Sequence, residues 1–241
     1  MKKVLVVGAS GATGRLLVKI LLQKNINVVA IVRDSKSLMH LADSYSTLQI
    51  VETELTEMSE RALGVHIKEC NAVLSCLGHN LTFKGMFGQP RPLVTDTIKK
   101  IAQSIETVNS DNVTKIILMN TTGNSNRDIP ENPPLSQRFV ISLLRLLLPP
   151  HVDNEDAADY LRLHVGQTNK NIEWAAVRPD SLIDEEKTTP YDVFPSPIRN
   201  AIFDAAPTSR INVAELMSEL AVNKELWKKW KGQMPVIYNN A

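Results

Sequence analysis

The chain has 241 residues, of which 43% are hydrophobic and 22% are charged, and 27 basic against 26 acidic residues leave a net charge of +1. This composition supports a buried core without disulfides or metals, and the balanced charge argues against nucleic-acid binding. The two cysteines, Cys70 and Cys76, have no metal-ligand spacing, so we expect free buried thiols, a reducing compartment and no metal.

The longest apolar stretch is residues 139–148, and Ser142 and Arg145 interrupt it. It is too short to span a bilayer. The lysines near the amino terminus are followed by only four apolar residues before a polar turn, which is unlike a signal peptide. We therefore expect a cytoplasmic protein with no membrane partner.

Apolar runs and helical periodicity alternate along the chain. In chain order, we predict strands over residues 3–7, 28–32, 48–51, 72–77, 116–119 and 174–177. We predict helices over residues 14–24, 38–44, 93–108, 139–148 and 156–168. Strands that alternate with helices imply right-handed crossovers, and therefore an α/β fold with a doubly wound parallel sheet.

Three glycines, Gly8, Gly11 and Gly14, separate the first predicted strand from the first predicted helix. In such a turn the first glycine permits a sharp bend, the second lets the backbone approach a pyrophosphate, and the third lets the helix pack on the sheet. The helix then offers free N–H groups to phosphates, and Ser10 and Thr13 can add hydroxyl donors. The context favours a dinucleotide-binding Rossmann turn over a nucleotide-free glycine turn.

The whole chain, residues 1–241, is predicted to be one NAD(P)-binding domain. Residues 130–134 and 189–197 are rich in proline and are predicted to be surface loops beyond the strand ends, where a substrate site would be built. We expect residues 180–241 to pack over the cofactor crevice as a small substrate-side cap, without forming an independent domain.

The second strand ends in a charged segment that bears on cofactor choice. Asp34 lies about where an acid reads the ribose hydroxyls of NAD, whereas Arg33 could bind the 2′-phosphate of NADP, and Lys36 adds a second cation. Two cations against one acid favour NADP over NAD. The alternative is a solvated charged loop without a role in binding.

Several motifs together resemble the atypical short-chain dehydrogenases/reductases, in particular the NmrA-like and biliverdin reductase B (flavin reductase)-like branch. These motifs are GASGATG at 8–14, IVRD at 31–34, DYLRLH at 159–164, AAVRP at 175–179 and SRINVA at 209–214. The resemblance extends from residue 3 to the PVIY segment at 235–238.

The resemblance implies a cofactor contact at each of several positions. The pyrophosphate would be held by Gly8, Ser10, Gly11, Ala12, Thr13 and Gly14, and the 2′-phosphate by Arg33. The other implied contacts are Glu54 and Leu55 beside the adenine, Cys76, Leu77 and Gly78 along the cofactor, Thr121 near the nicotinamide, and Pro179 near the carboxamide. Glu54 is one carbon longer than the aspartate that the family usually has at this position.

The Tyr-x-x-x-Lys dyad of this superfamily is absent from the chain. The residues four places after Tyr45, Tyr160 and Tyr191 are Gln49, His164 and Pro195, and Tyr238 is too near the end. Tyr160 and His164 share a helix face, so His164 could be a general acid or orient a substrate; the alternative is a packed structural pair. Our catalytic candidates are Thr121, Tyr160 and His164, and we expect Thr121 and His164 to line one pocket.

Other polar residues have weaker patterns. Arg178 could face a substrate carboxylate or could be structural. His79 and His151 are expected to be inert loop residues.

These observations lead to two functional hypotheses. The first is an NADPH-dependent reductase of a small planar acceptor such as a flavin or quinone, because delocalised acceptors can be protonated by solvent and need no Tyr-Lys dyad. The second, which the NmrA resemblance permits, is a non-catalytic NADP(H)-binding regulator or assembly factor. Its candidate partner surface is residues 139–148, although we favour an ordinary buried helix there.

Overall fold

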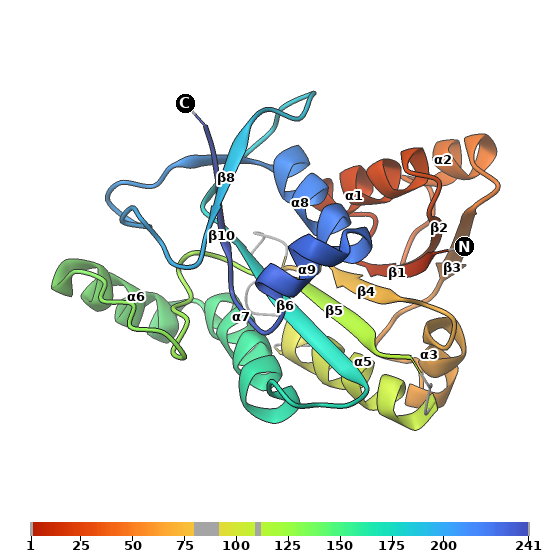
Figure 1. Cartoon of the computed structure of the whole chain (residues 1–241), viewed down its shortest axis with the longest axis horizontal. Helices are drawn as coiled ribbons and strands as arrows, with labels where there is room; N and C mark the ends of the chain where they lie inside the picture. Colours follow the sequence, from red (N-terminus) through yellow and green to blue (C-terminus); the bar gives the residue numbers. More distant parts are fainter. Residues whose placement is uncertain (1, 80–91, 109–111, 241) are drawn as a thin grey trace.

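The computed structural model describes residues 2–79, 92–108 and 112–240 (Figure 1). Its centre is a sheet in the order β3-β2-β1-β4-β5-β6-β10-β8, in which only the β10–β8 pair is antiparallel. The strands are β1 (Lys3–Val7), β2 (Asn27–Val32), β3 (Leu48–Glu52), β4 (Ala72–Ser75), β5 (Thr114–Met119), β6 (Ile172–Pro179), β8 (Tyr191–Phe194) and β10 (Val236–Asn239). Two short strands, β7 (Ser181–Ile183) and β9 (Pro207–Ser209), pair with each other.

Helices cover both faces of this sheet (Figure 1). They are α1 (Ala12–Gln23), α2 (Met39–Ser44), α3 (Glu60–Ile67), α5 (Leu93–Val108), α6 (Leu135–Leu147), α7 (Pro149–Tyr160), the π-helix η1 (Leu161–Val165), α8 (Arg210–Val222) and α9 (Lys224–Trp230). Along β1, Val4 and Val6 join the core beneath α1 and α8, whereas Leu5 and Val7 join the core beneath α3, α5 and α7. Because successive side chains of a strand point to opposite faces, this alternation defines two helical layers. The predicted doubly wound parallel sheet is confirmed.

Helices α3, α8 and α9 were not among the predicted helices, and α7 begins earlier than predicted. Helix α3 was not predicted, although its amino end has a regular cap, in which Ser59 Oγ accepts a hydrogen bond from Ala62 N at 3.1 Å. Helix α7 begins at Pro149, seven residues before the predicted start, because proline is tolerated in the first turn of a helix, where its missing N–H is not needed. Residues 149–155 therefore belong to the helix, and this change moves the candidate site.

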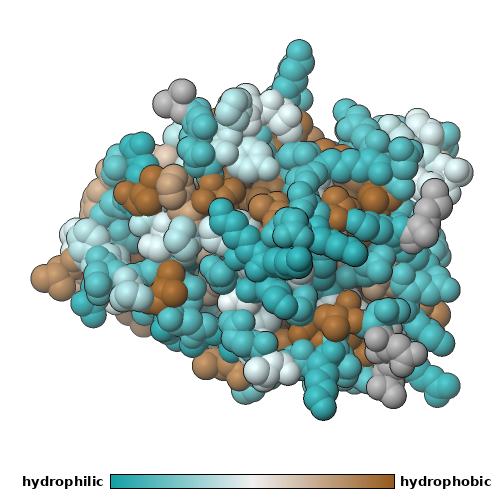
Figure 2. All heavy atoms as spheres, viewed as in Figure 1, coloured by the Kyte–Doolittle hydropathy of each residue, from teal (hydrophilic) through white to brown (hydrophobic). Residues whose placement is uncertain are grey.

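Helix α6 is an exposed apolar helix, so the expectation of an ordinary buried helix over residues 139–148 is wrong. Only Gln137 and Ile141 are buried in it, whereas Leu135, Phe139 and Leu146 expose 78%, 72% and 79% of their surface. Figure 1 shows α6 beside α7 at the edge of the molecule, and hydrophobic residues reach the surface at that edge in Figure 2. Apolar residues lie on more than one side of α6, and a single neighbouring helix covers only one of them.

Residues 180–241 contribute to the same sheet and core as the rest of the chain. Strand β10 pairs with β6, and Ile237 of β10 is fully buried in the core beneath α1 and α8. Helix α8 packs along α1, and its amino end is capped by Ser209, whose hydroxyl accepts a hydrogen bond from Asn212 N. Across the described ranges, no helix combines the length and hydropathy that crossing a membrane requires.

Candidate functional site

The turn between β1 and α1 leaves no room for side chains at two of its glycines. Gly8 has φ +72°, a left-handed conformation that glycine adopts without strain, and a Cβ there would lie 2.6 Å from the carbonyl carbon of Cys76. A Cβ on Gly14 would lie 2.1 Å from the carbonyl oxygen of Gly8. Gly11 closes the turn by donating its N–H to the same oxygen at 3.1 Å. The turn therefore holds the start of α1 tightly against the end of β1.

The amino end of α1 is not capped by its own chain. Its N-cap is Gly11, which provides no side-chain cap, no side chain of the described residues accepts from the first turn, and that turn contains no acidic residue. Ser10, Gly11 and Ala12 are exposed, while Thr13 is buried. This end lies at the carboxyl edge of the sheet between β1 and β4, where the strand order reverses and α/β proteins bind ligands. Unsatisfied N–H groups and a positive dipole end fit the pyrophosphate of a dinucleotide.

At the end of β2, the candidate ribose-side ligands Arg33 and Asp34 differ in whether they already have an ionic partner. The Asp34 carboxylate accepts a hydrogen bond from Lys36 N at 2.9 Å and lies 3.5 Å from Lys36 Nζ. The Lys36 backbone N–H is the main reason that the pKa of Asp34 is lowered. Arg33 is exposed and forms no ion pair within the described part of the chain. The cation is thus available for a phosphate, while the acid already has a partner.

The segments after β3 and β4 carry the remaining adenine-side candidates. Glu54 is exposed and Leu55 is half-buried, and Lys100 Nζ of α5 holds this segment by donating to the carbonyls of Leu55, Thr56 and Met58.

After β4, Cys76 is buried, Leu77 is half-buried and Gly78 is exposed. Burial raises the pKa of the Cys76 thiol to about 12, and burial likewise raises that of Cys70 to about 12. Neither thiol is therefore a nucleophile near neutral pH.

Thr121 and Pro179 lie close together at the carboxyl ends of β5 and β6. The carbonyl of Pro179 accepts a hydrogen bond from Thr122 N at 3.1 Å, and Thr121 Oγ1 accepts one from Gly123 N at 3.2 Å. Asn120 Nδ2 donates to the carbonyl of Asn154 at 2.8 Å and so ties this turn to α7. The first half of α7 therefore faces the strand ends.

The structure does not bring Tyr160 and His164 to Thr121. Helix α7 runs back toward the start of β6, and ten residues of helical rise between Asn154 and His164 amount to about 15 Å. His164 is exposed, and its ring stacks on Tyr160 with centroids 5.2 Å apart. The physical reason is the early start of α7, which places residues 149–155, and not 160–164, beside the turn after β5.

A different histidine occupies that place. His151, in the first turn of α7, has a side chain that is only 12% exposed. Its Cε1 lies 3.1 Å from the position of a Cβ on Gly123, and Thr121 Oγ1 lies 3.7 Å from that same position. Gly123 thus makes room for the imidazole beside Thr121. His151 was predicted to lie in a loop; the spacing His-x-x-x-Glu directly after Pro-Pro is compatible with a helix that begins at Pro149 but does not by itself require one.

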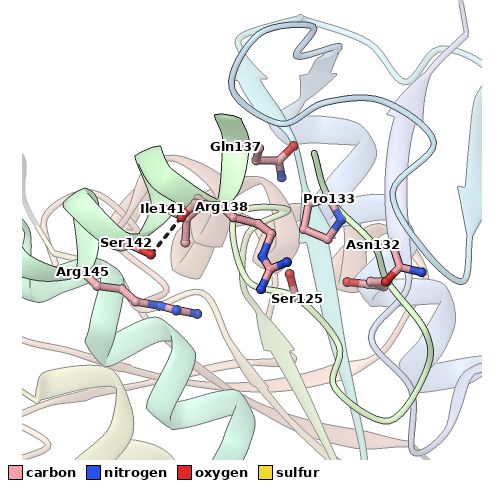
Figure 3. A pocket seen from close by; sticks show the side chains of 9 residues that line it. Ser125, Asn132, Pro133, Gln137, Arg138, Ile141, Ser142 and Arg145 are labelled. Carbon is pink, nitrogen blue, oxygen red and sulfur yellow. Dashed lines mark hydrogen bonds between the residues drawn. The ribbon is translucent and has the colours of Figure 1, made fainter. Parts of the chain in front are cut away.

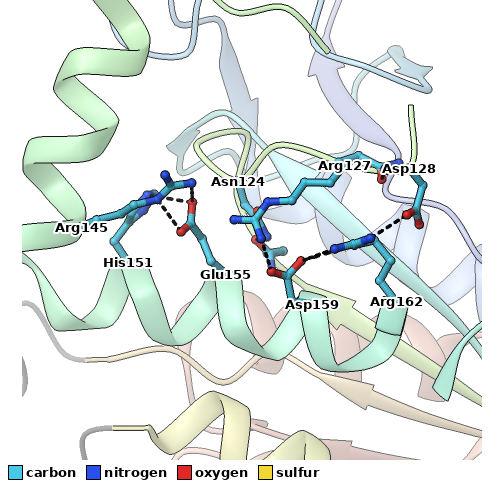
Figure 4. Close-up of polar contacts among 10 residues, drawn as sticks. Asn124, Arg127, Asp128, Arg145, His151, Glu155, Asp159 and Arg162 are labelled. Carbon is cyan, nitrogen blue, oxygen red and sulfur yellow. Dashed lines mark hydrogen bonds and ion pairs between the residues drawn. The ribbon is translucent and has the colours of Figure 1, made fainter. Parts of the chain in front are cut away.

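Glu155 orients this histidine from one turn further along α7. His151 Nε2 lies 3.4 Å from Glu155 Oε1, and the Glu155 carboxylate also accepts two hydrogen bonds from Arg145, at 2.7 and 2.9 Å (Figure 4). Burial alone would raise the pKa of Glu155, but its contact with His151 and its hydrogen bonds from Arg145 outweigh that effect, so its pKa is lowered. Nε2 is buried and makes no hydrogen bond to a described residue, which leaves Nδ1 as the ring nitrogen that can exchange a proton.

Two other buried polar residues, Asp153 and Arg178, have structural roles in this arrangement. Asp153 caps α5, since it accepts hydrogen bonds from Val94 N and Thr95 N at 2.7 and 2.8 Å, and its carboxylate lies 2.7 Å from His79 Nε2. Arg178 is fully buried, and its guanidinium binds Glu131 and backbone carbonyls. Arg178 therefore does not face a substrate carboxylate.

The chain matches the model of a protein family described as NAD(P)H-binding over residues 8–224. A comparison with curated proteins finds no match. Among solved structures, a protein named as an NAD-dependent epimerase/dehydratase from Bacillus halodurans is 22% identical, with a TM-score of 0.72, and 100% of this chain and 95% of that one are covered.

Two further solved structures share the fold. A short-chain dehydrogenase/reductase from Veillonella parvula in complex with NADP is 13% identical, with a TM-score of 0.69 and coverage of 100% and 95%. A protein named as an NADH-flavin reductase from Streptococcus pneumoniae is 18% identical, with a TM-score of 0.63 and coverage of 100% of both chains. These likenesses concern the fold, whereas the family match covers most of the chain and agrees with the glycine turn. The chain therefore belongs to the NAD(P)H-binding family.

Proposed function

We propose that this protein is an NADPH-dependent reductase of a small planar acceptor, such as a flavin or a quinone. The observation that carries the proposal is the uncapped amino end of α1 beneath the glycine turn, which is built to receive a dinucleotide at the same sheet edge as Thr121 and His151. One structural relative is named as a flavin reductase, and another binds NADP.

The choice of NADP over NAD rests on the end of β2. Arg33 presents an unpaired guanidinium within the described residues, and guanidinium groups bind phosphates through two parallel hydrogen bonds. Asp34, which would repel a 2′-phosphate, is partly neutralised by Lys36. The unpaired Arg33 and the partly neutralised Asp34 therefore both favour NADP over NAD.

We assign separate roles in the reaction to the residues at the strand ends. NADPH, when bound, supplies a hydride to the acceptor. The Thr121 hydroxyl can hydrogen-bond to an oxygen or nitrogen of the acceptor, and His151 Nδ1 can deliver the proton that balances the added hydride. The Glu155 carboxylate places a negative charge 3.4 Å from Nε2 of this imidazole. The products are NADP⁺ and the acceptor reduced by two electrons and two protons, one proton carried in the hydride and one delivered by His151, which is then reprotonated from water.

The direct test is NADPH consumption by the purified protein with riboflavin, FMN, naphthoquinone and an aliphatic aldehyde as separate acceptors. We expect turnover with the planar acceptors and not with the aldehyde, since the Tyr-Lys dyad for carbonyl reduction is absent. Binding of NADPH without its consumption by any acceptor would reject the proposal.

That negative outcome would favour the second candidate, a non-catalytic NADP(H)-binding regulator. One specific observation supports it, namely the exposed apolar residues of α6, which a monomeric enzyme would not need. The two candidates differ in whether the cofactor is consumed, so the same assay separates them.

A further inference from the structure

A polar cavity of about 380 Å³ lies between α6 and the loop that joins it to β5. Ser125, Glu131, Asn132 and Pro133 line it from the loop, and Arg138, Ile141 and Arg145 are among the residues that line it from α6 (Figure 3). This volume falls within the range of small-molecule sites in proteins.

The charges around the cavity are not balanced. Glu131 is paired with the buried Arg178 at 2.7 Å, and Arg145 is paired with Glu155. Arg138 lies on the exposed side of α6, and its guanidinium points toward Ser125 in Figure 3. It forms no ion pair with any residue in the described ranges. Among the residues that line the cavity, Arg138 is therefore the one cation without an ionic partner in the described ranges.

The cavity also adjoins the candidate site through shared residues. Ile141 lines the cavity, and its Cδ1 lies 3.7 Å from the position of a Cβ on Gly123, the glycine against which the His151 ring packs. Arg145 lines the cavity and also binds the carboxylate that orients His151. An acceptor whose ring lies at Thr121 could thus extend a side group into the cavity.

We propose that this cavity binds an anionic side group of the acceptor, a phosphate or a carboxylate, through Arg138. The inference rests on the proposed function, because it narrows the acceptor to planar molecules that carry such a group. Ser125 and Asn132 supply neutral hydrogen-bond donors around the anion, and Arg138 supplies the charge, whereas the Ser142 hydroxyl already donates to the Arg138 carbonyl.

Flavin binding tests this directly, since FMN and riboflavin differ only by a phosphate. Quenching of flavin fluorescence measures both affinities without turnover. We expect the wild-type protein to bind FMN about tenfold or more tightly than riboflavin, the usual size of one charge-assisted contact. Arg138→Ala should reduce FMN affinity to that of riboflavin and leave riboflavin binding unchanged. Arg61→Ala, on the exposed side of α3, removes the same charge elsewhere and should change neither affinity.

Equal binding of the two flavins by the wild-type protein, including no binding of either, would overturn the proposal. An equal loss of both affinities in Arg138→Ala would overturn it as well, because the residue would then support the structure and not the phosphate. Inorganic phosphate should compete with FMN and not with riboflavin. If FMN binding depends on Arg138 but the protein does not oxidise NADPH, the proposed anion site stands and the proposed reductase function is rejected.

Discussion

Arg178 and Glu131 form a two-pronged ion pair inside the protein, with Nη2–Oε1 and Nη1–Oε2 distances of 2.7 and 3.0 Å. Arg178 also donates to the carbonyls of Met234, Asn124 and Pro195. It therefore links β6 to the segment before β10, to the β5–α6 loop and to the residue that follows β8. The pair fixes the loop that carries both Thr121 and the polar cavity.

Breaking this pair should strongly destabilise the protein. Glu131→Gln leaves a buried guanidinium without a counter-charge, and we expect a loss of about 3–5 kcal/mol in the free energy of unfolding. Urea denaturation at neutral pH measures it. Asp204→Asn, which breaks the exposed ion pair with Arg199, is the control and should cost about 1 kcal/mol or less. Equal losses in the two variants would contradict a structural role for the buried pair.

A methyl group at Gly14 should disrupt the cofactor turn. Because its Cβ would lie 2.1 Å from the Gly8 oxygen, Gly14→Ala must displace the backbone, at a cost of about 1–3 kcal/mol. It should also abolish dinucleotide binding in a calorimetric titration. Gly78→Ala is the matched control for stability, since a Cβ there meets nothing within 4 Å. Unchanged NADPH binding by Gly14→Ala would show that the cofactor binds elsewhere.

Removal of the Arg33 guanidinium should change cofactor preference. Arg33→Ala is expected to weaken NADP binding about tenfold or more, the usual effect of losing a charged hydrogen bond, and to leave NAD binding unaltered. Calorimetry with both dinucleotides measures the ratio. Asp34→Asn should not weaken NADP binding. If Arg33→Ala weakens both cofactors equally, the residue does not read the 2′-phosphate.

Two histidines near opposite ends of one helical segment offer a matched comparison. His151→Asn should lower kcat for a reducible acceptor by about a hundredfold if the imidazole delivers the proton, while the Kd of NADPH stays within a factor of two or so. His164→Asn, in the exposed η1 segment, should leave kcat unchanged. A decrease of less than about threefold in His151→Asn would indicate that solvent protonates the acceptor.

Stability should depend on Glu155 in the acid range. Because the folded pKa of Glu155 is lowered from its ordinary value of 4.5, the unfolded state binds the proton first as pH falls. The stabilisation is therefore complete above that ordinary value and is lost as pH falls through the lower folded pKa. The difference in unfolding free energy between the wild type and Glu155→Gln should be largest near pH 7 and should shrink under acid.

The regular parts of the fold were predictable because local patterns determine them. Apolar runs located β1 and β2 within one residue, and the glycine spacing located the turn at Gly8. The catalytic prediction depended on where one helix begins. The proline pair at 149–150 can end one helix or begin another, and only packing against α5 and the turn after β5 settles which. His151 and Glu155 therefore could not be found from periodicity alone, and the exposure of α6 likewise depends on which neighbours cover it.

The two buried thiols have a practical consequence for observing the protein at work. Because Cys70 and Cys76 are buried and their pKa values are raised to about 12, neither should react with maleimides in the native state near neutral pH. A cysteine introduced on exposed α6, for example Ser136→Cys, would then be labelled selectively without removing a native residue. A fluorophore or spin label placed there would report directly on the wall of the polar cavity as flavin or cofactor is added.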